Sequence, residues 1–275
     1  MENLNFNLFS SFEFYRHFSN GYNIFNQDGV FSVWKKNIYK KLYLGIYGFY
    51  SIYFYNLSFT DLFKKYDIIE FVDLFNKIDE KDFKYTTYTE WNFSFIDYKK
   101  DTLFKNIPKR KKQYIEKYLK LEKKGEILFI KENNINIFKE IQKEHESILG
   151  YKGFPISILK NFLKEDYTDM FYLKYKDKVV SSVILFKEDK KIYYFLNVSN
   201  LIVRKIHGLG DFLLYKLITY YKNENSIFML GHTPLYNKSL LNYKLNFATD
   251  NFNFKIYKIF KNRFWYSLFK LKEKI

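Results

Sequence analysis

The chain has 275 residues, of which 47% are hydrophobic, so it can form one large or two small domains with a substantial core. Its 46 lysines and arginines outnumber its 30 acidic residues, and the net charge of +16 favours anionic partners. Cysteine is absent, which excludes disulfides, thiolate metal sites and a cysteine nucleophile. The four histidines have no metal-ligand spacing, so we expect no bound metal.

The first hundred residues contain alternating strand and helix patterns. We expect strands at 30–34, 42–46, 49–55 and 85–95, and helices at 57–66 and 68–78. The uncharged stretch 42–60 approaches the roughly 20 residues that span a bilayer, but its tyrosines are spread throughout and two glycines interrupt it. A buried hairpin is therefore expected rather than a membrane helix. The N-terminus has no secretion signal, so the expected location is the cytoplasm.

A basic helix is expected at 107–124. Between Lys105 and Lys124 the sequence has nine basic and two acidic residues. Further on, the apolar periodicities predict strand, two helices, three strands, a loop, helix, strand, helix and strand. These elements are expected at 127–130, 135–149, 156–163, 171–175, 179–186, 192–198, 211–222, 227–230, 236–246 and 252–260.

A glycine-containing loop precedes the helix at 211–222. Gly208 and Gly210 lack the Cβ atoms that would keep a ligand away from the backbone, and Lys205 adds a cation. Unpaired N–H groups at a helix N-terminus bind phosphate. We therefore predict a pyrophosphate site, with the binding residues Lys205, Gly208, Leu209, Gly210 and Asp211.

The element order resembles the GNAT acyltransferase fold, and its details resemble the Fem-type branch that modifies cell-wall precursors or surface saccharides. Three passages carry the resemblance: the basic helix beginning at Lys109, the loop and helix from Lys205 to Lys222, and Leu240–Ala248 with its Tyr243-Lys244 pair. The resemblance implies a mixed, mostly antiparallel α/β sheet flanked by helices. It also implies a truncated N-terminal GNAT-like half at 1–106, a joining helix at 107–124 and an acyltransferase domain at 125–275.

The resemblance further implies an N-acyltransferase. The expected donor is acyl-CoA, for example acetyl-CoA, and the acceptor is an amine on a phosphorylated saccharide or cell-wall precursor. An aminoacyl-tRNA is the alternative donor. Basic residues suit phosphorylated ligands, so Arg110 and Lys112 are the expected substrate contacts.

The expected chemistry is aminolysis, which needs a proton acceptor and donors to an oxyanion. The resemblance places the oxyanion donors at the backbone near Asn197 and Val198. His232 is a candidate base or a structural residue. Tyr243 is a candidate proton donor or a packed ring, and Lys244 either points into the cleft or is a surface lysine.

Two readings without catalysis remain open at the sequence level. One is an inactive GNAT-fold binding protein, and the other is a nucleic-acid-binding module that stacks bases on Tyr114 and Tyr118. Separately, Phe260–Lys270 mixes cations with aromatic residues. This pattern is typical of a helix at the inner membrane surface, or of a terminal helix packed on the core with its lysines in water.

Overall fold

The computed structural model describes residues 66–73, 81, 83–150, 152–223 and 226–272, and the shorter segments 23–27, 30–36, 40–43, 45–46, 49–50, 60 and 63–64. The chain forms two compact units. The first comprises 1–93, 232–238 and 252–275, and the second comprises 94–231 and 239–251.

An antiparallel meander forms the centre of the second unit. Its strands are β9 (Thr168–Tyr175), β10 (Lys178–Glu188) and β11 (Lys191–Ser199). On the outer edge of β9 lies antiparallel β8 (Ile127–Lys131), and on the outer edge of β11 lies parallel β12 (Ile227–Pro234). Short polar turns between β-rich runs make the meander local in sequence, whereas the parallel pair needs a helical crossover.

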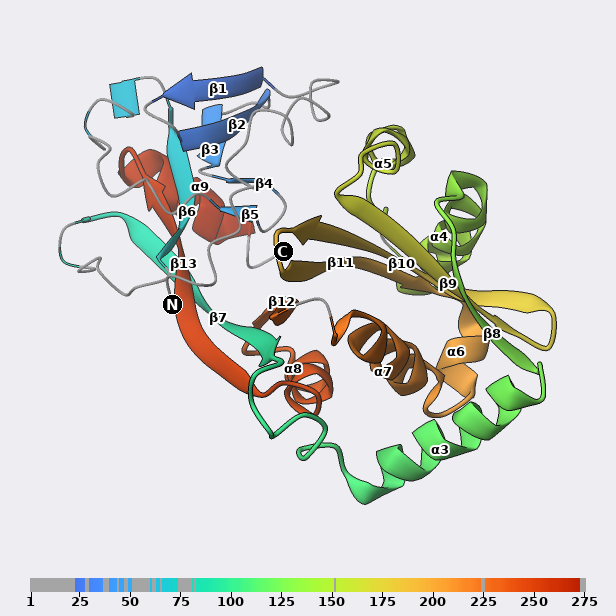
Figure 1. Ribbon diagram of the computed structural model, residues 1–275. Coiled ribbons are helices and arrows are strands. Elements are labelled where there is room, and N and C mark those ends of the chain that lie inside the picture. Colours follow the sequence, from blue (N-terminus) through green and yellow to red (C-terminus); the bar gives the residue numbers. More distant parts are fainter. Residues whose placement is uncertain are drawn as a thin grey trace. The chain divides into compact units, whose positions relative to one another are not determined.

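Helices cover both faces of this sheet. They are α3 (Lys109–Lys123), α4 (Ile135–Leu149), α5 (Ile156–Phe162), α6 (Leu201–Lys205), α7 (Leu209–Tyr221) and α8 (Lys238–Leu245). Figure 1 shows α4 and α5 on one face of strands β8 to β11 and α7 on the other. The buried face of α7, including Phe212, Leu214 and Leu217, packs on sheet residues such as Phe171 and Val183. Burial of this apolar surface holds the helix against the sheet.

The first unit is built around strands from distant parts of the chain. In hydrogen-bonding order they are β1 (Asn23–Gln27), β2 (Val30–Lys36), β3 (Lys40–Tyr43), β6 (Ile68–Asp73), β13 (Asp250–Phe260) and β7 (Thr86–Asp97). A separate hairpin pairs β4 (Gly45–Ile46) with β5 (Phe49–Tyr50), and α9 (Arg263–Lys272) follows β13. The predicted fold class, a mixed and mostly antiparallel sheet flanked by helices, is confirmed.

Three sequence predictions need correction. The helix expected at 68–78 is wrong, because residues 68–73 form β6, whose apolar side chains are buried against β13. A five-residue helix, α6, was not foreseen, and it places Lys205 at a helix end rather than in a loop. The strand expected to end at 230 continues to Pro234, because Gly231, with φ of 75°, changes the backbone direction without ending the strand.

Other predictions in the N-terminal half have mixed outcomes. The glycine-split hairpin near residues 45–50 is present as β4 and β5. The expected strand residues 51–55 and most of the helix at 57–66 lie outside the described residues. Among the residues that the structure does describe, no helix is long and apolar enough to cross a bilayer.

The domain boundaries expected at 106 and 124 stay a prediction. The two compact units combine segments that are far apart in the sequence. The reason is β13, whose residues Lys255 to Phe260 pair with Asp73 to Ile68. This pairing places the end of the chain in the first unit. Sequence order alone gives no sign of such a long-range pairing.

Candidate active site

The candidate active site begins where β11 and β12 part. Their ladder is short and ends at the pair Tyr193 and Met229, although both strands continue beyond it. On the other side of β11, the register with β10 shifts, because Ile184 pairs with Leu196 and Leu185 pairs with Tyr194. Such a bulge bends a strand and redirects its backbone. The parted strands therefore provide a place where a substrate can reach main-chain groups.

Lys244 lies beside this point and is buried. Its ammonium nitrogen is 3.8 Å from the position that a Cβ atom would take at Gly231, and the Tyr193 hydroxyl is 3.4 Å from the same position. Burial lowers the pKa of Lys244 to about 7 and raises the pKa of Tyr193. The backbone at Gly231 therefore passes within contact distance of an amine that can accept a proton near neutral pH.

Tyr243 connects the same helix to the beginning of α7. Its hydroxyl donates a hydrogen bond to the carbonyl oxygen of Gly210 at 3.0 Å. Burial, with smaller contributions from Tyr194 and Asp211, holds the Tyr243 pKa well above its usual value. The phenol therefore stays protonated. The neighbouring residues Tyr243 and Lys244 reach two different parts of the second unit, the α7 N-terminus and the parted strands.

The N-terminus of α7, predicted as a phosphate cradle, is lined by the protein's own side chains. Gly208 has φ of 85°, and a Cβ atom there would lie 2.5 Å from the Tyr114 Cβ of α3. Asp211 forms an ion pair with Lys111, in which the ammonium nitrogen lies 2.8 Å from a carboxylate oxygen. The same ammonium lies 5.1 Å from the ring centre of Tyr243. The Asp211 carboxylate complements the positive N-terminal end of the α7 dipole, and the Lys111 ammonium is held there by its ion pair with this carboxylate.

The remaining loop residues have mainly structural surroundings. Leu209 is fully buried in the core, and the carbonyl oxygen of His207 accepts a 2.7 Å hydrogen bond from Tyr118. Lys205 is exposed at the end of α6. The loop therefore packs tightly against α3.

Asn197 and Val198 take part in a polar network at the end of β11. The Ser181 hydroxyl donates to the Asn197 side chain at 3.0 Å and to the Val198 carbonyl oxygen at 2.9 Å. One ring nitrogen of His145 lies 2.9 Å from the carbonyl oxygen of Ser199. These bonds fix the end of β11, and the role of Asn197 and Val198 as oxyanion donors stays a prediction.

His232 has an aromatic environment in the first unit. Its ring lies 5.1 Å from Trp91 in an edge-on arrangement and 6.4 Å from Phe254. Because β12 continues through His232, this residue is part of a strand and does not follow one. The structural reading of His232 matches these contacts better than the reading as a base.

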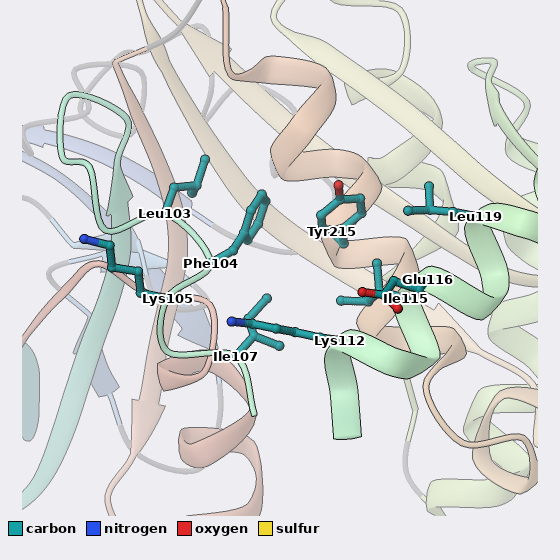
Figure 2. Close-up of a pocket in the computed structure, with 9 residues that line it drawn as sticks. All are labelled: Leu103, Phe104, Lys105, Ile107, Lys112, Ile115, Glu116, Leu119 and Tyr215. Carbon is teal, nitrogen blue, oxygen red and sulfur yellow. The ribbon is translucent and has the colours of Figure 1, made fainter. Parts of the chain in front are cut away.

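Arg110 and Lys112, the predicted substrate contacts, occupy different surroundings on α3. The Arg110 side chain donates to the Tyr114 hydroxyl at 3.0 Å. Lys112 lines a cavity of about 320 Å³, in which side chains of the loop before α3 face those of α3 and α7 (Figure 2). Phe104 and Tyr215 form its aromatic wall, with ring centres 4.9 Å apart. Lys244 does not line this cavity.

Sequence reasoning missed four residues that shape the site. Tyr193 and Gly231 define the space beside Lys244, while Lys111 and Tyr114 close the α7 N-terminus. Gly231 lies inside β12, directly after the buried apolar run Ile227–Leu230, and a glycine within a strand is a usable signal of a close backbone approach. Lys111 belongs to a run of four cations, and neither Lys111 nor Tyr114 carries a local sequence sign of its partner at the α7 N-terminus.

Comparison with known proteins is informative only at the level of structure. No protein-family model and no curated protein matches the sequence. L-PGS from Bacillus licheniformis superposes with a TM-score of 0.58 at 16% identity, over 88% of this chain and 85% of that one. The C-terminal domain of a putative lysylphosphatidylglycerol synthetase from Agrobacterium fabrum gives 0.61 at 11% identity, over 95% and 89%. FemX gives 0.60 at 12% identity, over 93% and 92%. The chain shares their fold.

Proposed function

We propose that the protein transfers an acyl group from an activated ester or thioester to an amine on a cell-wall or surface-saccharide precursor. The observation that carries the proposal is Lys244, a buried amine with a pKa near 7 at the point where two strands part. Half of such an amine is neutral at neutral pH, which suits a general base. The fold shared with FemX and with the putative lipid-modifying synthetase supports the same class of reaction.

In the proposed reaction, the acceptor amine attacks the acyl carbonyl carbon. A C–N bond forms, and the bond between the carbonyl carbon and the donor's oxygen or sulfur breaks. Neutral Lys244 takes the proton that the amine loses, and this proton then passes to the leaving oxygen or sulfur. Backbone N–H groups near Asn197 and Val198 stabilise the oxyanion. Tyr243 holds α8 against the N-terminus of α7 through its hydrogen bond to the Gly210 carbonyl oxygen.

The nature of the donor depends on the α7 N-terminus. Acyl-CoA would bring a pyrophosphate to this helix end, where it would meet the carboxylate of Asp211 and a loop already packed against Tyr114. An anion next to the carboxylate is unfavourable, and it would compete with Asp211 for the Lys111 ammonium. We therefore favour an aminoacyl-tRNA as the donor and keep acyl-CoA as the alternative. Basic side chains along α3 are exposed and suit a polyanion: Lys109, Arg110, Lys112, Lys117, Lys120 and Lys123.

Binding and transfer with the two donors test the proposal. Wild-type protein is titrated with charged tRNA and with acetyl-CoA at several salt concentrations. We expect saturable tRNA binding that falls steeply with salt, because many phosphates release counterions. Tight acetyl-CoA binding with a shallow salt dependence would select the alternative donor. No transfer from either donor to an amine acceptor would contradict acyl transfer itself.

The Asp211→Asn variant separates the donors more sharply. If CoA binds at the α7 N-terminus, removal of the negative charge should strengthen its binding. If tRNA is the donor and binds through α3, tRNA affinity should change little. Lys222→Met is the matched control, because it removes an exposed cation at the opposite end of α7 without touching Asp211.

A further inference from the structure

The last helix, α9, has two different apolar faces. On one face, Tyr266 and Phe269 pack against the body of the first unit, where their rings lie 5.6 Å and 5.1 Å from Phe260. The other face carries Phe264, Leu268 and Leu271, which are 63%, 45% and 63% exposed. At 100° per residue, these three positions fall within an arc of about 60°. The helix is thus anchored on one side and presents an apolar stripe on the other.

The sequence around this stripe is strongly basic, with Glu273 as the acidic residue beside it. Between Lys255 and Lys272 the chain contains six basic residues and no acidic one. Lys261 and Arg263, at the start of the helix, are exposed. Trp265 lies next to the stripe, 5.1 Å from the Phe264 ring and only partly buried. Trp beside an apolar stripe with flanking cations is the composition of helices that lie in a membrane interface.

We propose that α9 docks the protein on the surface of an anionic lipid bilayer. Phe264, Leu268 and Leu271 enter the boundary between headgroups and acyl chains. The flanking cations remain at the level of the lipid phosphates, and Trp265 sits at the interface. The face bearing Tyr266 and Phe269 stays packed on the protein, so docking needs no unfolding of the helix. A precursor carried by a lipid would then be presented to an enzyme held at the same surface.

An anionic bilayer fits the stripe better than the other possible occupants. A nucleic acid would use the cations but leave three large apolar side chains in water. A second copy of this chain would bring a second set of cations against the first, which is unfavourable. A bilayer satisfies both the apolar and the charged part of the surface at once.

Vesicle binding by the full chain tests this docking. We expect sedimentation with vesicles of phosphatidylglycerol and phosphatidylcholine in equal parts, and weak binding to phosphatidylcholine alone. A triple variant, Phe264→Ser, Leu268→Ser and Leu271→Ser, should lose at least about tenfold in partitioning. The matched control, Leu201→Ser with Tyr220→Ser, removes exposed apolar side chains from α6 and α7 and should bind as the wild type.

Two further measurements distinguish loss of membrane docking from loss of the folded state. Trp emission should shift to the blue on addition of the anionic vesicles, and the Trp265→Phe variant should lose this shift. The melting curve of the triple variant should match the wild type, because the replaced side chains are exposed. Equal binding of the triple variant and the wild type, no binding to anionic vesicles, or a change only in oligomeric state would overturn the proposal. Because vesicle binding is measured without turnover, docking and acyl transfer can fail separately.

Discussion

The α7 N-terminus and the surroundings of Lys244 both contain glycines close to charged groups, but the glycines serve different purposes. At Gly208 the missing side chain makes room for Tyr114 of the same protein. At Gly231 a Cβ atom would lie at ordinary contact distance from the Lys244 ammonium and the Tyr193 hydroxyl, and the φ of 75° is what favours glycine. A glycine pattern therefore indicates that something approaches the backbone closely. Only the neighbouring side chains decide whether the approaching group is a ligand or a helix.

The largest expected effect is on turnover at Lys244. Replacement by methionine keeps the length of the side chain and removes the amine, so the rate should fall at least about 100-fold, as for the loss of a general base. The wild-type rate should rise with pH around 7, where Lys244 loses its proton. Steady-state rates across pH 5 to 9 check both points. The control is Lys238→Met, an exposed lysine of the same helix, and an unchanged rate in Lys244→Met would assign this lysine a structural role.

Stability should respond to the same change with a definite sign. The Lys244 pKa is about 7 in the folded state and about 10.5 in the unfolded state, so between these values the unfolded chain binds more protons. The cost of burying Lys244 is therefore largest below pH 7 and disappears as pH approaches 10.5. Each unit of pKa difference corresponds to about 1.4 kcal/mol. Lys244→Met should therefore raise the free energy of unfolding by a few kcal/mol at pH 6. Denaturant unfolding at pH 6 and pH 10 measures this, and equal effects at both pH values would contradict it.

Gly208→Ala should reduce the free energy of unfolding by about 2 kcal/mol or more, because the new Cβ collides with Tyr114 and the backbone is left-handed. Gly210→Ala is the matched comparison. Its added Cβ meets nothing closer than 4.0 Å, so its stability should change little. Thermal unfolding of both variants distinguishes the two glycines. Equal losses would mean that the contact with Tyr114 does not decide the role of Gly208.

The smallest expected effect is that of Tyr243→Phe. This change removes one hydrogen bond to the Gly210 carbonyl oxygen while keeping the ring, so stability should fall by about 1 kcal/mol. Turnover should fall only modestly, since the proposed role of Tyr243 is to position the helix. A loss of rate as large as that of Lys244→Met would instead make Tyr243 a proton donor.

Much of the fold could be predicted from local patterns. The order of elements from 127 to 260 follows from apolar periodicity and turn residues, and the structure differs mainly by adding α6 and extending β12. The prediction of a helix at 68–78 was wrong, because the periodicity of a short apolar run cannot distinguish a buried strand from a buried helix. The pairing of this run with β13, almost 190 residues later, makes it a strand.

The sequence by itself determined the meander and the helices around it, because these depend on neighbours along the chain. The pair Tyr243 and Lys244 was indicated by the resemblance of the passage Leu240–Ala248 to the Fem-type branch. The tertiary structure decided that β13 joins the first unit, that Tyr114 fills the space at Gly208 and that Lys111 pairs with Asp211. It also decided the pKa of Lys244, since desolvation depends on everything packed around an amine and not on its place in the sequence.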